Sequence, residues 1–161
     1  PASNYRMARE ALLDRVLVPA AQVHRLAGEL PPAAGAERGE RDLRALLGDA
    51  PDAGVDLALL GVGADGHTES LFPGSPALDE RARWVVATEA PPGVTPRARL
   101  TLTLPALCAA RAVLVLAVGA EKRDAVRRAL AGEGPLRPVA RVRGRERTAW
   151  LLDDGAAAGA R

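Results

Sequence analysis

The feature that most constrains the fold is a pair of strand-length apolar runs, each of which ends in glycine. The first run, residues 55–60, is apolar except for Asp56 and leads into Gly61; the second, residues 112–118, leads into Gly119. Such runs are typical of strands that are buried on both faces of a parallel sheet. Segments with helical spacing alternate with them along the chain. The sequence therefore predicts an α/β fold, a Rossmann-like parallel sheet with helices on both faces.

Weaker patterns predict the remaining elements. Asn4 is a suitable cap for a helix that runs to about Leu17, and Ala33–Gly39 reads as a small-residue loop before a short helix at 40–47. The alternating stretch 99–103 indicates a half-exposed strand. Further strands are expected at 84–88 and 148–152, and further helices at 121–130 and at the Ala-rich end of the chain.

Composition excludes several classes of protein. At 161 residues, 48% of them hydrophobic, the chain is long enough for one domain with a sizeable core, and we treat residues 1–161 as that domain. The 22 basic and 20 acidic residues leave a net charge of +2, which argues against a nucleic-acid partner. A single cysteine, Cys108, excludes an internal disulfide. No apolar run has the length of a membrane span and no signal-peptide pattern opens the chain, so a cytoplasmic location and no membrane partner are expected.

The loop that follows the first apolar run carries the residues suited to chemistry. It reads GVGADGHTESLFP over residues 61–73 and contains one of only two histidines. Ligands of parallel sheets bind beyond the carboxyl ends of the strands, where this loop is expected. Histidine transfers protons readily near neutral pH, and an aspartate two residues before His67 can fix its tautomer. The alternative is a plain strand-to-helix turn in which Asp65 caps a helix and His67 is incidental.

Five segments together resemble a known family. The loop GVGADGHTESLFP resembles the signature of the 6-phosphogluconolactonases, within the superfamily of sugar-phosphate isomerases and deaminases. The segments SNYRMAREALL, PRARLTLTLPAL, VLAVGAEKR and TAWLLDDGAA resemble other family segments, in the same order. Relatives that act on glucosamine 6-phosphate carry Asn-Glu-Pro after the histidine. Here Ser70-Leu71-Phe72-Pro73 follows, which favours the lactonases.

The resemblance implies a hydrolytic site on this loop. Its members hydrolyse 6-phosphogluconolactone to 6-phosphogluconate in the pentose phosphate pathway, and the matching positions make His67 the general base for water, oriented by Asp65. The loop glycines would approach the substrate closely, and their amides would support the oxyanion of the reaction. These glycines are Gly61, Gly63 and Gly66.

The resemblance also implies cations for the phosphate of the substrate, and it assigns Arg99 and Lys122 to this task. Lys122 is the only lysine of the chain and is expected at a helix N-terminus, where an anion is favoured. Arg99 is alternatively a solvated strand residue. Arg141 belongs to a basic loop that reads mainly as a solvated segment, but we keep it as a further candidate. Asn4 is a candidate for the border of the pocket.

The expected partner is a small-molecule sugar phosphate, with no metal and no cofactor, and the sequence leaves the oligomeric state open. Two other functions remain open. One is an isomerase similar to glucosamine-6-phosphate deaminase; the other is a non-catalytic fragment that binds a sugar phosphate.

Departures from the family pattern are also visible. Glu69 stands where the family usually has a small residue, and Cys108 where asparagine is common. The family's initial strand with its Gly-Gly-x-Thr-Pro phosphate loop, and the strand that ends in Asp-Glu-Arg, have no counterpart here. We therefore expect the chain to be the C-terminal portion of the family's fold, a fragment or the ordered part of a longer polypeptide.

Overall fold

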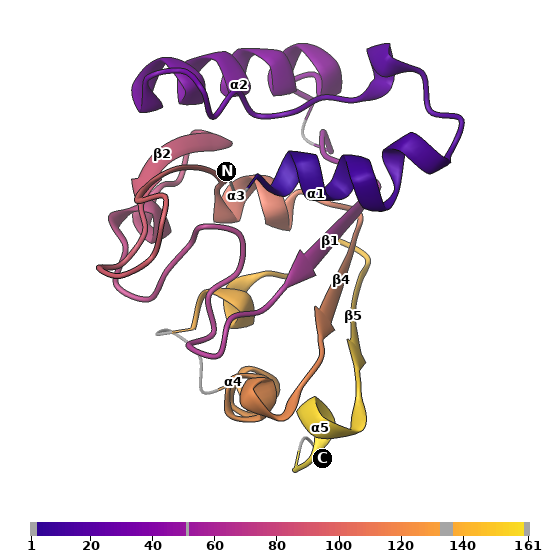
Figure 1. Ribbon diagram of the computed structural model, residues 1–161, viewed down its shortest axis with the longest axis vertical. Coiled ribbons are helices and arrows are strands. Elements are labelled where there is room, and N and C mark those ends of the chain that lie inside the picture. The colour runs from indigo at the N-terminus through magenta and orange to yellow at the C-terminus, as the bar shows by residue number, and fades with distance from the viewer. Residues whose placement is uncertain (1–2, 51, 133–136, 160–161) are drawn as a thin grey trace.

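Three parallel strands form the main sheet, and their order in space follows their order in the sequence (Figure 1). In this computed structural model, residues 3–50, 52–132 and 137–159 are described. The register pairs Leu59 with Leu114, and Leu114 with Ala149. Because the pairing is parallel, all three strands end at the same edge of the sheet. The strands are β1 (Leu57–Gly61), β4 (Ala112–Ala117) and β5 (Arg147–Leu152).

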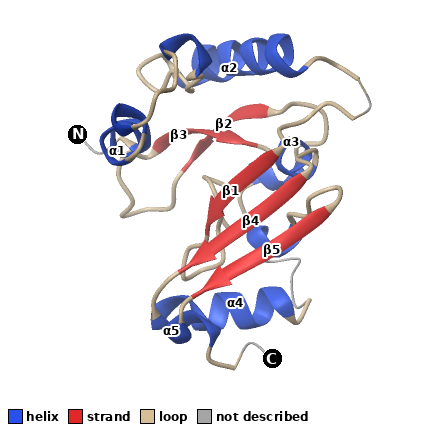
Figure 2. Cartoon of the chain, turned by 90° about the vertical axis from the view of Figure 1, so that its right-hand side faces the viewer, coloured by secondary structure: helices blue, strands red, loops and turns tan. Residues whose placement is uncertain are grey.

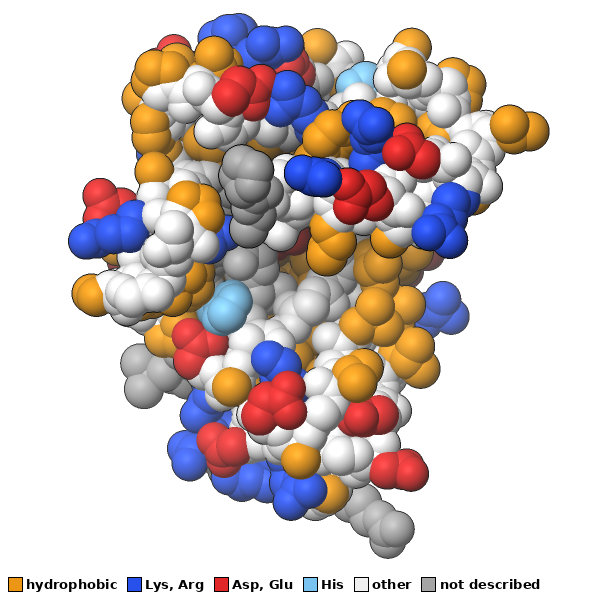
Figure 3. All heavy atoms as spheres, in the orientation of Figure 1, with side chains coloured by type: hydrophobic (Ala, Val, Ile, Leu, Met, Phe, Trp, Pro, Cys, Tyr) orange, Lys and Arg blue, Asp and Glu red, His pale blue; other side chains and the backbone are white. Residues whose placement is uncertain are grey.

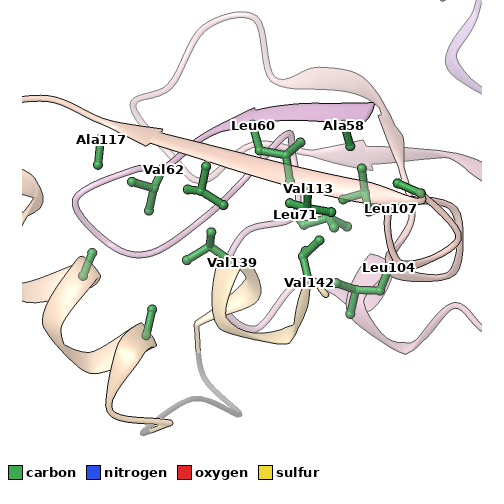
Figure 4. Close-up of a cluster of buried hydrophobic side chains, with 14 of the residues drawn as sticks. Ala58, Leu60, Val62, Leu71, Leu104, Leu107, Val113, Ala117, Val139 and Val142 are labelled. Carbon is green, nitrogen blue, oxygen red and sulfur yellow. The ribbon is translucent and has the colours of Figure 1, made fainter. Parts of the chain in front are cut away.

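The core lies on one face of this sheet. Side chains alternate along β1, so that Ala58 and Leu60 are buried while Leu57 and Leu59 are exposed. The buried set of β4, which includes Val113 and Val115, continues the same face (Figure 4). Helices and a 3₁₀ turn contribute the other half of this core. They are α3 (Leu104–Cys108), α4 (Arg123–Leu130) and the turn Pro138–Arg141.

A second, smaller layer contains an antiparallel pair of strands, β2 (Val85–Glu89) and β3 (Ala98–Leu102). Helix α2 (Pro32–Leu47) packs against this pair (Figure 2). The approach is close because the helix presents glycine: a Cβ atom on Gly39 would lie 3.1 Å from Cγ1 of Val85. The two predicted strands are thus confirmed as strands, but they pair with each other rather than within the parallel sheet.

The helices differ from the sequence prediction in their limits. Helix α2 begins at Pro32, so the segment 33–39 that we expected to be a loop is helical; Pro fits the first turn of a helix, and the small residues there pack closely on β2 and β3. Helix α1 (Asn4–Ala11) is capped by Ser3, whose Oγ accepts from the N–H of Arg6 at 3.2 Å, and not by Asn4. It ends at Ala11 because it buries none of its residues, so no packing extends it to Leu17. Short helix α5 (Asp154–Ala157) follows β5.

The predicted α/β fold with a parallel sheet is confirmed, although helices cover the sheet unevenly. In Figure 2 the three strands lie in front of the helices, and no helix of the described chain crosses their near face. Leu57, Leu59 and Leu151 on that face are 55%, 58% and 60% exposed. Figure 3 shows hydrophobic side chains gathered beside the strands, at mid-height on the right. The exposed leucines share one face, whereas the exposed hydrophobic residues of a folded domain are normally scattered singly.

Candidate active site

The loop after β1 is closed by its own backbone. The N–H of Gly63 donates to the carbonyl of His67 at 2.8 Å, and the N–H of Gly66 donates to the carbonyl of Gly63 at 2.9 Å. Gly66 has a φ of +86°, a conformation that glycine adopts at little cost. The buried hydroxyl of Thr68 donates to the carbonyl of Gly61 at 2.8 Å and holds the loop to the end of the strand. These bonds place residues 65–67 just beyond the carboxyl end of β1.

Within this turn, Asp65 and His67 form a hydrogen-bonded pair. Nδ1 of His67 lies 2.6 Å from Oδ1 of Asp65, and the amide of His67 donates to the same oxygen at 3.1 Å. An ionised carboxylate only accepts, so Nδ1 is the donor and Nε2 of the neutral ring keeps its lone pair. Partial burial raises the pKa of Asp65, but the backbone and side-chain hydrogen bonds from His67 outweigh this effect and leave the pKa below its usual value. The pair therefore contains an ionised carboxylate that holds Nδ1 of the imidazole and leaves Nε2 directed away from it.

The surroundings of the imidazole restrict its movement without covering it. The side chain of His67 is 34% exposed, and its ring packs against Phe72 with the centroids 4.7 Å apart. On another side lies Gly63, where an added Cβ atom would overlap Nδ1 of His67 and lie 2.6 Å from Oδ1 of Asp65. Glycine at position 63 is thus required by the pair itself.

The loop amides are already engaged. The N–H groups of Gly63, Gly66 and His67 each donate to an acceptor inside the loop. The expectation that the amides of Gly63 and Gly66 support an oxyanion does not fit this geometry, because these donors hold the turn together. Gly61 closes β1, and a Cβ atom there would meet nothing within 4 Å.

Lys122 lies beyond the end of the neighbouring strand, in the 3₁₀ turn Ala120–Lys122 that leads into α4. Its own amide donates to the carbonyl of Gly119 at 3.1 Å. The amide of Gly119 in turn lies 3.0 Å from each carboxylate oxygen of Asp153. Hydrogen bonds from the amides of Ala156 and Gly119 lower the pKa of Asp153. The segment TAWLLDDGAA contains Asp153, but its letters do not reveal the contact with Gly119, which lies 34 residues earlier in the chain.

Arg99 lies on β3, in the smaller layer. It is half-buried, and its Nε donates to the carbonyl of Pro96 at 2.8 Å. Two residues further, Oγ1 of Thr101 accepts from the amide of Ser70 at 3.1 Å. Residues two apart on a strand share a side. Arg99 therefore lies on the side of β3 to which the segment after His67 is attached.

The two remaining candidates are placed differently. Nη2 of Arg141 donates to the carbonyl of Leu78 at 3.1 Å, so its guanidinium braces the turn Pro76–Asp79. Its own carbonyl faces the half-buried Cys108, with Sγ at 3.5 Å. Asn4 is the exposed first residue of α1. The contacts of Arg141 with Leu78 and Cys108 favour a structural role for Arg141.

Glu69 has an unusual position for a charged residue. Its φ of +53° lies in the left-handed region, and its side chain lines a hollow of about 230 Å³ whose walls include Leu57, Leu59 and Trp84. The residue keeps exposed surface, yet these apolar walls remove water from its carboxyl group. Burial therefore raises the pKa of Glu69.

Within residues 3–50, 52–132 and 137–159, no group of three or more His, Cys, Asp and Glu side chains is arranged to hold a metal ion. Over the same residues, no helix has both the length and the apolar character to cross a membrane.

The sheet is parallel, and an imidazole–carboxylate pair and a lysine lie beyond the carboxyl ends of its strands. These features are typical of the α/β domains that bind small ligands at this edge of the sheet. Comparison with known proteins gives the family. Residues 1–150 match the model of the glucosamine-6-phosphate isomerases/6-phosphogluconolactonase family, and the chain belongs to this family.

Individual relatives agree with this assignment. The chain is 45% identical over 163 residues to a 6-phosphogluconolactonase of Mycobacterium tuberculosis, covering 96% of this chain and 65% of that protein. The crystal structure of the devB protein matches with a TM-score of 0.87 and 34% identity, over 97% of this chain and 66% of the other. The 6-phosphogluconolactonase of Trypanosoma brucei matches with a TM-score of 0.78 and 34% identity, over 97% and 67%. The chain thus spans about 65% of the length of the curated relative.

Proposed function

We propose that the protein to which this chain belongs hydrolyses 6-phosphogluconolactone to 6-phosphogluconate, with His67 as the general base. The observation that carries the proposal is the 2.6 Å hydrogen bond between Nδ1 of His67 and Asp65, at the strand-end edge of the sheet. The names of relatives suggest the substrate, since the Mycobacterium tuberculosis and Trypanosoma brucei proteins, which match 96% and 97% of this chain, are 6-phosphogluconolactonases. The motif Ser70-Leu71-Phe72-Pro73 after the pair supports the lactonase side of the family.

The arrangement suits the chemistry of lactone opening. Nε2 of His67 takes a proton from water while the water oxygen bonds to the lactone carbonyl carbon, and the carbonyl becomes an oxyanion. When this intermediate collapses, the bond to the ring oxygen breaks, and the proton on His67 passes to that oxygen. The new carboxylic acid loses its proton to solvent. Asp65 stabilises the imidazolium that exists between the two transfers.

Two cations are proposed for the phosphate of the substrate. Lys122 lies beyond the end of β4, and a lysine ammonium binds phosphate as a compact charge. Arg99 belongs to the second layer, on the same side of β3 as Thr101, whose Oγ1 accepts from the amide of Ser70. Arg141 is kept as a secondary candidate; its Nη2 donates to the carbonyl of Leu78 and braces the turn Pro76–Asp79.

The direct test is hydrolysis of freshly prepared 6-phosphogluconolactone by the purified chain and by its His67→Ala variant, corrected for spontaneous opening. General base catalysis is typically worth about 10²–10⁴-fold, so the variant should lose activity by that factor while circular dichroism and the melting temperature stay unchanged. Full activity in a folded His67→Ala variant would refute the assignment.

The same assay decides between the open alternatives. Turnover of glucosamine 6-phosphate with release of ammonia, and no turnover of the lactone, would identify a deaminase-like isomerase. Binding of 6-phosphogluconate by calorimetry without turnover of either compound would identify a non-catalytic sugar-phosphate-binding unit.

A further inference from the structure

Gly66, which separates Asp65 from His67, is covered by a side chain from a distant part of the chain. A Cβ atom placed on Gly66 would lie 3.0 Å from Cβ, 3.0 Å from Cδ and 3.1 Å from Cγ of Arg137. The aliphatic stem of Arg137 therefore lies flat against the backbone at the centre of the turn. The Arg137 side chain is only 18% exposed.

The backbone next to Arg137 adds a second contact to the same glycine. The N–H of Val139 donates to the carbonyl of Gly66 at 3.1 Å. Val139 itself is fully buried and belongs to the core cluster with Val62 and Leu71, as Figure 4 shows. Segment 137–139 thus holds Gly66 in two ways, by the packing of the Arg137 stem and by the backbone hydrogen bond from Val139. The segment itself is fixed because Val139 is buried in the core.

The charged end of Arg137 is fixed as well. Its Nη2 lies 3.1 Å from Oδ2 of Asp124, in the first turn of α4. Asp124 also binds Arg127 and Arg128, and the hydrogen bonds from Arg128 and Arg127 lower its pKa. Those two arginine side chains are 42% and 44% exposed, so Arg137 is the most buried of these three partners. Helix α4 follows directly on Lys122. The helix therefore connects the proposed phosphate ligand Lys122 with the anchor of Arg137.

We infer that Arg137 is a positioning residue for the Asp65–His67 pair, with its stem braced on Gly66 and its guanidinium anchored on Asp124. The inference rests on the proposed function. In the part of the chain that the structure describes, the polar partner of the Arg137 side chain is Asp124 and neither Asp65 nor His67. Arg137 therefore acts through the backbone of Gly66 between them. Because both hydrogen bonds from His67 end on one oxygen of Asp65, a shift of the Gly66 peptide changes the direction in which Nε2 points. A misplacement of about 1 Å near a reacting group can cost about 100-fold in rate.

The experiment compares three variants of the chain. Arg137→Ala removes the stem and the charge, and Arg137→Met keeps most of the stem but removes the charge. Arg127→Met is the matched control, because it removes another arginine partner of Asp124 without touching Gly66. In Arg137→Ala we expect kcat for the lactone to fall by about 10–100-fold with KM nearly unchanged, since the substrate ligands are not altered. Arg137→Met should lose less, and Arg127→Met should match the parent chain.

A second measurement does not depend on activity. The chain has only two histidines, so the imidazole signals of His67 can be followed by NMR, with His67→Ala for assignment. The chemical shifts and pH titration of His67 should change in Arg137→Ala and remain at parent values in Arg127→Met. If these signals move as expected but no chain turns over the lactone, the positioning role stands and the proposed function fails. If Arg137→Ala and Arg127→Met give the same kcat and the same His67 titration, the inference is wrong.

Discussion

The imidazole of His67 occupies the space that a Cβ atom on Gly63 would need. The two residues are also joined through the backbone, since the N–H of Gly63 donates to the carbonyl of His67 at 2.8 Å. The side chain that we propose as the base can therefore keep its orientation only if residue 63 has no side chain.

The first prediction follows from this relationship. Gly63→Ala should displace the ring from Oδ1 of Asp65 and lower kcat by about 100-fold, because the misplaced base no longer faces its substrate. Gly28→Ala is the matched control, since a Cβ atom there would meet nothing within 4 Å. Steady-state kinetics and melting curves of both variants check the prediction. Equal kcat values for the two variants would contradict it.

The second prediction concerns the carboxylate of the pair. Asp65→Asn keeps the shape of the side chain but can present an N–H to Nδ1, which favours the tautomer that lacks a lone pair on Nε2. We expect a loss of about 10²–10⁴-fold in kcat, comparable to that of His67→Ala, because the two residues act as a unit. Kinetics of the single and double variants measure this. Additive losses would show that the two side chains act independently.

The third prediction tests the two proposed phosphate ligands. Hydrogen bonds from charged groups contribute about 1.5–3 kcal/mol, so Lys122→Met and Arg99→Met should each raise KM by about 10–100-fold and change kcat less. Arg111→Met serves as control, since this exposed arginine precedes β4 at the opposite end of the strand and binds Asp56 and Glu146. A KM for either ligand variant equal to that of the control would remove that residue from the site.

The fourth prediction concerns Glu69. Its pKa is raised in the folded chain, so the folded form holds the proton more tightly than the unfolded form does. The free energy of unfolding should therefore fall as pH rises from the ordinary value of 4.5 through the higher folded value. Glu69→Gln removes the charge, so it should be more stable than the parent at neutral pH. Urea denaturation at several pH values measures the difference. If Glu69→Gln were more stable than the parent by the same amount below pH 4.5 as at neutral pH, the gain would not come from removing a desolvated charge, and the prediction would be wrong.

The fifth prediction compares neighbours on β1. Leu60 is 3% exposed and Leu59 is 58% exposed, on opposite faces of the same strand. Leu60→Ala should lower the free energy of unfolding by about 2–5 kcal/mol, whereas Leu59→Ala should change it by about 0.5 kcal/mol or less. Denaturant unfolding at two protein concentrations checks both values. A large, concentration-dependent cost for Leu59→Ala would mean that another surface covers this face in solution.

Local chemistry explains which features were predictable. The apolar runs at 55–60 and 112–118 predicted strands, although one face of β1 is open rather than buried. The DGH motif predicted an aspartate able to orient an imidazole, but not whether the two side chains touch. The pairing of β2 with β3 was not visible, because an alternating strand such as 98–102 does not reveal its partner. The helical state of 33–39 depends on the close contact of Gly39 with Val85, which is a tertiary interaction. The contacts of Asp153 with Gly119, and of Arg137 with Gly66, join residues far apart in the sequence and have no local signature.

The same distant contacts bear on when the site can form. During synthesis, the loop with His67 leaves the ribosome well before Arg137 and Val139, which hold Gly66. Asp153, the anchor of Gly119, is 34 residues further along the chain than its partner. Long-range contacts form late because they must first close long loops. We therefore expect a nascent or C-terminally shortened chain to have β1 and its loop, but to hold the Asp65–His67 pair in its final position only when Arg137 and Val139 have packed against Gly66.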